Sequence, residues 1–140
     1  PVSLDSKMVP EEALPDLVEG KGRLIVLIDD QESVLLMAKR LFERLGFVCE
    51  AFPEGERALE FLFTSSVPVS MVFTDLGMPA QDGLSFAQEI RRRGLKAPIV
   101  LTTGNSLGLS GGELAGYGVT QLLSKPYGLH ELSGCLGEAL

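Results

Sequence analysis

Several residues that can bind metal ions or phosphate stand at the ends of apolar runs in this sequence. They are Asp29, Asp30, Asp75, Thr102 and Lys125. Asp75 is the clearest case, because it closes a run that starts at Met71 and is followed by Gly77 and Pro79, which favour a turn. In an open α/β sheet, ligands bind at the carboxyl ends of the strands. Alone, Asp75 would be read as a capping or turn residue, but together with the others it indicates a functional site.

These residue types suit a divalent metal ion and a phosphoryl group. Three carboxylates repel one another unless a cation lies between them, and carboxylate oxygens are ligands that Mg²⁺ prefers. The ammonium of Lys125 would neutralise phosphoryl oxygens, and the hydroxyl of Thr102, which has Thr103 beside it, would donate a hydrogen bond to them. One of the carboxylates can itself be the nucleophile and form an acyl phosphate.

Five apolar runs rich in branched residues predict the strands that position this set. They cover residues 24–28, 47–52, 69–74, 99–102 and 119–124. Leu24–Ile28 is apolar throughout, as expected for a parallel strand that is buried on both faces.

Between these runs, the apolar residues recur at helical spacing. The predicted helices cover residues 31–45, 56–63, 83–93 and 129–140. The segment 104–118 holds six glycines, and each glycine inside a helix costs roughly 1 kcal/mol relative to alanine. We therefore expect the fourth helix to be short, irregular or mobile.

The alternation of strands and helices predicts an α/β fold. Parallel strands with right-handed crossovers lead to a flavodoxin-like (βα)5 doubly wound sheet with the strand order 2-1-3-4-5. The switch point of this order lies between the first and third strands. It would bring Asp29, Asp30 and Asp75 together, although they are far apart in the sequence.

The composition fits one domain preceded by a linker. The chain has 140 residues, 45% of them hydrophobic, and a formal net charge of −7. This charge disfavours nucleic acid or an anionic membrane as a partner of the domain, because phosphates are bound by Lys and Arg. Residues 1–22 hold Pro10, Pro15 and Gly20 without a sustained period, so we predict a linker or disordered leader there and the domain at 23–140.

The cysteines and the longest apolar runs indicate a cytoplasmic domain. Cys49 and Cys135 fit neither a metal spacing nor a disulfide framework, which favours free thiols in a reducing compartment. No apolar run approaches the roughly 20 residues needed to cross a bilayer, and no signal peptide is visible.

Short motifs stand in order at the predicted strand ends. They are Ile28–Asp30, Phe73–Pro79 with Asp82–Gly83, Ile99–Thr102 and Ser124–Pro126. Each motif alone is weakly specific, whereas all of them in this order are strongly specific. From about Arg23 to its end, the chain resembles a receiver domain of two-component signalling.

The resemblance implies that Asp75 accepts a phosphoryl group from a phosphohistidine on a histidine kinase or histidine phosphotransfer domain. It also implies that Asp30 and Asp75 bind Mg²⁺ (or Mn²⁺) directly, together with the backbone carbonyl of Gly77, while Asp29 acts mostly through a bound water. Such a domain is not an enzyme beyond its own phosphorylation and dephosphorylation, and any kinase activity would lie in an upstream domain.

The resemblance assigns the remaining residues to the phosphoryl group. Thr102 would hydrogen-bond it after transfer, and Lys125 would pair with Asp75 or with the phosphate. It further implies a cis peptide between Lys125 and Pro126, which the sequence permits. Receivers usually carry an aromatic residue three positions before this lysine, where the chain has Leu122.

Three settings are open for such a domain. The first is the C-terminal receiver of a hybrid sensor histidine kinase, tethered through upstream domains; the leader, the chain end after the last helix and Leu122 favour it. The second is the receiver of a stand-alone response regulator that controls an output domain. The third is a small phosphatase-like or flavin-binding α/β protein. A phosphatase would need an aspartate where Gly77 stands, and Asp29 and Asp30 would repel a flavin phosphate.

Overall fold

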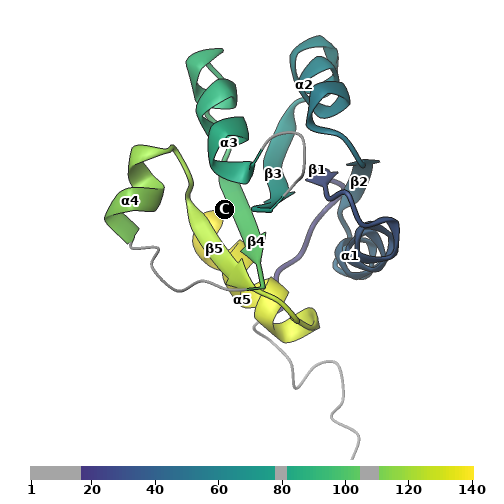
Figure 1. The fold of residues 1–140 in the computed structure, drawn as a ribbon. Helices are drawn as coiled ribbons and strands as arrows, with labels where there is room; N and C mark the ends of the chain where they lie inside the picture. Colours follow the sequence, from purple (N-terminus) through teal and green to yellow (C-terminus); the bar gives the residue numbers. More distant parts are fainter. Residues whose placement is uncertain (1–16, 78–81, 105–110) are drawn as a thin grey trace, which may run out of the picture.

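A five-stranded parallel sheet with the order β2-β1-β3-β4-β5 organises the chain (Figure 1). The computed structural model describes residues 17–77, 82–104 and 111–140. Its elements are β1 (Leu24–Ile28), α1 (Glu32–Arg44), β2 (Val48–Phe52), α2 (Gly55–Thr64), β3 (Val69–Asp75), α3 (Gly83–Arg92), β4 (Ile99–Thr103), α4 (Gly111–Gly116), β5 (Gln121–Ser124) and α5 (Leu129–Ala139). The predicted flavodoxin-like topology is confirmed. Over these ranges, no helix is long and apolar enough to cross a bilayer.

Helices cover both faces of the sheet, which explains why its central strands are apolar throughout (Figure 1). Ile25 and Leu27 of β1 point to one face, where they pack with Phe42 of α1 and Leu132 of α5. Val26 and Ile28 point to the other, where the cluster contains side chains of α2, α3 and α4. Every residue of β1 is therefore buried, whichever face it is on.

The fourth helix is short, as the glycine content predicted. It has 6 residues, whereas α1 has 13, and residues 105–110 of the glycine-rich segment lie outside the described residues. Arg91 of α3 holds the chain that follows α4. Its Nε donates to the carbonyl of Gly118 at 3.0 Å, and its Nη1 donates to those of Leu95 and Ala97, both at 2.8 Å.

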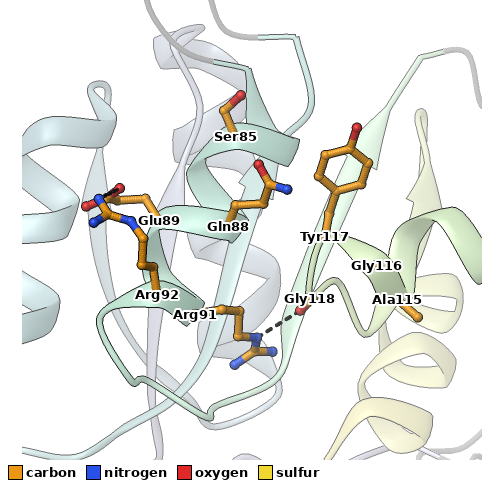
Figure 2. Close-up of a pocket in the computed structure, with 9 residues that line it drawn as sticks. All are labelled: Ser85, Gln88, Glu89, Arg91, Arg92, Ala115, Gly116, Tyr117 and Gly118. Atoms are coloured by element: carbon orange, nitrogen blue, oxygen red, sulfur yellow. Dashed lines mark hydrogen bonds and ion pairs between the residues drawn. The ribbon is translucent and has the colours of Figure 1, made fainter.

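Figure 2 shows this arginine at the base of a groove between α3 and α4. Polar residues of α3 such as Ser85 and Gln88 line one side of the groove, and Tyr117 lines the other. Arginines at the carboxyl end of a helix usually interact with the helix dipole and remain solvated. The Arg91 side chain is instead half-buried and joins two loops.

The segment before β1 is packed against the domain from Leu17 onward. The Val18 N–H donates to Ser133 Oγ of α5 at 2.6 Å, and the Gly20 N–H donates to the Leu45 carbonyl at 2.6 Å. Leu17 and Val18 also contact the core cluster beneath α1 and α5. The packed unit thus includes six residues that the predicted boundary at residue 23 assigned to the linker. The rest of that predicted leader, residues 1–16, lies outside the described residues.

Candidate functional site

The predicted carboxylates meet at the carboxyl ends of β1 and β3. The two strands are neighbours, and Ile28 pairs with Thr74, so the residues that follow each of them lie side by side. One carboxylate oxygen from each of Asp29, Asp30 and Asp75 lies within 4.8 Å of the others. Asp29 and Asp75 are buried, whereas Asp30 is exposed at the rim. The strand order thus brings Asp29 and Asp30 beside Asp75, which is far from them in the sequence.

Lys125 reaches the same place from the end of β5. Its Nζ lies 2.9 Å from Asp75 Oδ1 and 3.1 Å from Asp29 Oδ2. The Lys125–Pro126 peptide is cis, as the resemblance implied. The Lys125 N–H donates to the Thr103 carbonyl at 2.7 Å, which continues the ladder between β4 and β5 by one residue. The ammonium therefore contacts two of the three carboxylates.

The balance of charge in this cluster favours a cation. Burial raises the pKa of Asp29, although the Gln31 N–H and Lys125 stabilise its ionised form. Burial lowers the pKa of Lys125, but its hydrogen bonds to Asp75 and Asp29 outweigh burial and the net pKa is raised. One ammonium thus faces three carboxylates. Because carboxylate oxygens at this spacing match the ligands of a hard divalent ion, Asp29, Asp30 and Asp75 fit a Mg²⁺ site.

Two threonines end β4, and their side chains start from opposite faces of the sheet. Thr102 pairs with Asp75 across β3 and β4, so its side chain lies on the same face of the sheet. It is only 2% exposed and lines a small cavity beneath Asp29. Thr103 is the last residue of β4 and its side chain points to the opposite face, because side chains alternate along a strand. The contact of Thr102 with a phosphoryl group stays a prediction.

Tyr127 lines the same small cavity as Asp29 and Thr102. It is buried, and its ring meets the edge of Phe73 with centroids 5.9 Å apart. Burial, with the nearby charges of Asp29 and Asp75, raises its pKa to about 12. The phenol is therefore protonated at neutral pH and available as a hydrogen-bond donor.

Proteins similar in sequence to this chain include both sensor kinases and transcriptional regulators. The chain is 30% identical over 140 residues to the sensor histidine kinase RcsC of Salmonella typhi, covering 96% of this chain and 14% of RcsC. It is 26% identical over 109 residues to the transcriptional regulatory protein RprY of Bacteroides fragilis, covering 78% of this chain and 45% of RprY. The chain thus spans less than half the length of either protein.

Solved structures and a family model agree with the fold. The chemotaxis protein CheY4 of Vibrio cholerae superposes with a TM-score of 0.78 at 23% identity, covering 85% of this chain and 99% of CheY4. The family model described as the response regulator receiver domain matches residues 25–136, which hold every site residue described above. The chain therefore belongs to the receiver domain family of two-component signalling.

Proposed function

We propose that Asp75 accepts a phosphoryl group from a phosphohistidine on a histidine kinase or histidine phosphotransfer domain. The observation that carries this proposal is the position of Asp75, a buried carboxylate at the end of β3 with Lys125 at 2.9 Å. A carboxylate oxygen attacks phosphorus and the bond from phosphorus to the imidazole nitrogen breaks, with its electron pair left on the ring. The product is an acyl phosphate on Asp75.

The neighbouring residues compensate the charge of this reaction. Asp29, Asp30 and Asp75, with the backbone carbonyl of Gly77, would hold Mg²⁺ or Mn²⁺. When bound, the ion neutralises negative charge on the phosphoryl oxygens. Lys125 balances the charge of Asp75 before transfer and that of the phosphoryl group after it. Self-phosphorylation from small donors and self-dephosphorylation are the only reactions that we propose for the domain itself.

We propose Thr103, in place of the predicted Thr102, as the hydroxyl donor to the phosphoryl group. Thr102 faces the cavity beneath Asp29. Thr103 is the last residue of β4, so it lies at the carboxyl edge of the sheet where Lys125 and the carboxylates meet, although its side chain starts from the opposite face. Thr103→Val should therefore shorten the life of the acyl phosphate more than Thr102→Val does.

The partner that we propose docks beside α1. Leu36 and Met37 on this helix are 49% and 46% exposed, and exposed apolar side chains next to a site suit a helical phosphodonor. RcsC and RprY represent the two settings that we consider, a receiver within a histidine kinase and a receiver that controls an output domain. We favour the first because Leu122 stands where receivers usually carry an aromatic residue. The cytoplasmic location stays a prediction.

Incubation with acetyl phosphate and Mg²⁺, followed by intact-mass measurement, tests the proposal. The chain should gain the mass of one phosphoryl group, and Asp75→Asn or an excess of EDTA should abolish the gain. Asp82→Asn is the matched control: Asp82 is an exposed carboxylate that caps α3 by accepting from the Ser85 N–H at 2.8 Å, and asparagine caps equally well. Unchanged phosphorylation of the Asp75→Asn variant would refute Asp75 as the acceptor.

A further inference from the structure

A small cavity lies beneath the acidic cluster, between the sheet and α1. Apolar side chains such as Val34, Leu35 and Phe73 form much of its wall, and the polar residues Asp29, Thr102 and Tyr127 complete it. About 10 Å³ is open to the centre of a water-sized sphere, which is close to the space that a single buried water needs.

The polar groups of this cavity lack enough partners. Thr102 is 2% exposed and Tyr127 is 8% exposed, and within the described part of the chain neither hydroxyl makes a hydrogen bond. A buried hydroxyl without a partner destabilises the folded state. Two such hydroxyls on one cavity, in a protein whose sheet is otherwise well paired, indicate a shared partner that is not a protein group.

Asp29 offers the third polar contact. Its Oδ1 accepts from the Gln31 N–H at 2.9 Å and its Oδ2 accepts from Lys125 Nζ at 3.1 Å. A carboxylate has about four lone-pair sites, so Asp29 can accept another hydrogen bond from the side of the cavity. A water between two hydroxyls and one carboxylate would have the two to four polar partners that buried waters need.

We propose that one water molecule occupies this cavity, held by the hydroxyls of Thr102 and Tyr127, and that it donates a hydrogen bond to Asp29. Thr102 and Tyr127 are then positioning residues: they fix the carboxylate of Asp29 through the water and do not touch the phosphoryl group. The effect on metal binding rests on the proposed function, because it takes Asp29 as part of the Mg²⁺ site. The water itself does not depend on it.

Thr102→Val and Tyr127→Phe remove one hydroxyl each and nearly keep the shape of the side chain. Hydrogen-bond partners of metal ligands contribute roughly 10–100-fold to metal affinity, so each variant should weaken Mg²⁺ binding by about 10-fold in calorimetric titration of the whole chain. The double variant should lose no more than either single variant, because both remove the same water. Tyr117→Phe, in the groove between α3 and α4, is the matched control and should bind Mg²⁺ unchanged.

Two measurements without metal test the water independently of the phosphoryl chemistry. Magnetic relaxation dispersion should detect one long-lived water in the unaltered chain that is absent from the double variant. In urea, Thr102→Val should lower the unfolding midpoint, because loss of the water leaves Tyr127 and Asp29 without its hydrogen bonds. A raised midpoint, with no long-lived water, would show a dry cavity and overturn the proposal.

Unaltered Mg²⁺ affinity in both variants would overturn the positioning role of Thr102 and Tyr127. Absence of Mg²⁺ binding by the unaltered chain would overturn the proposed function.

Discussion

At the level of single residues, the site holds more negative charge than its own side chains neutralise. Lys125 contacts Asp29 and Asp75, and Asp30 stands at the rim within 4.8 Å of both carboxylates. The domain therefore folds around a partly uncompensated charge. The repulsion between these carboxylates lowers the stability of the fold, and the same excess of negative charge attracts a cation.

We expect Asp29→Asn to raise the free energy of unfolding at neutral pH when no divalent metal is present. Burial raises the pKa of Asp29 above 3.8, so the folded state binds this proton more tightly than the unfolded chain does. The contribution of Asp29 to stability thus falls as the pH rises from 3.8 through the raised value. The gain of the variant should be full at neutral pH and vanish below pH 3.8, as urea denaturation across this range would show.

Glu60→Gln serves as the control, since Glu60 is an exposed carboxylate on α2, and it should change little over the same pH range. A lower stability of Asp29→Asn at neutral pH would contradict the expectation. It would mean that the ion pair of Asp29 with Lys125 at 3.1 Å outweighs the cost of burial.

The chemistry of the site could be predicted from the sequence where it follows from strand ends. Asp29, Asp75 and Lys125 each follow or close an apolar run, so the topology alone brings them together. The faces of the sheet on which Thr102 and Thr103 lie could not be predicted in this way. They depend on the register of β4 against β3, which a single sequence does not contain. The burial of Tyr127 could not be predicted from the sequence either.

At the level of elements, the periodic segments were predicted well and the irregular ones were not. The buried strands and the helices α1, α2, α3 and α5 were all anticipated, with small shifts at their ends. The bridging role of Arg91 was missed, because a cluster of arginines at a helix end is usually solvated. Its three carbonyl partners come from two loops, and no local pattern records contacts between loops.

Arg91→Lys should destabilise the domain by about 2–3 kcal/mol, because hydrogen bonds from charged donors contribute roughly 1.5–3 kcal/mol each and a lysine cannot reach several carbonyls at once. The loss should be greatest near α4, because Gly118, two residues after the end of this helix, is one of the acceptors. Urea denaturation measures the global effect, and amide hydrogen exchange shows whether α4 opens first.

Arg92→Lys is the comparison for this variant. Arg92 lies next in α3, pairs with Glu89 and is largely exposed, so its replacement should cost well under 1 kcal/mol. Equal losses for the two variants would show that the carbonyl contacts of Arg91 do not hold the loops together.

At the level of the whole molecule, the leader and the domain form one packed unit from Leu17. The segment crosses from α5, through Ser133, to the turn after α1, through Leu45. Gly22 adds a further bond to the Gly46 carbonyl at 2.8 Å. Composition could not reveal this arrangement, because glycines in a linker and glycines in a close backbone contact look alike. Here Gly20 is required: the position of a Cβ on it would overlap the backbone of Phe47.

Removal of residues 1–22 should therefore cost about 3 kcal/mol more than removal of residues 1–16. The longer deletion removes, among other contacts, the hydrogen bonds from the N–H groups of Val18, Gly20 and Gly22, worth roughly 1 kcal/mol each. It also uncovers the apolar cluster beneath α1 and α5. Urea denaturation of both shortened chains gives the difference. Ser133→Ala in the full chain removes the acceptor of the Val18 N–H and should cost about 1 kcal/mol. Two shortened chains of equal stability would mean that the leader lies on the domain without stabilising it, and the boundary at residue 23 would then be the functional one.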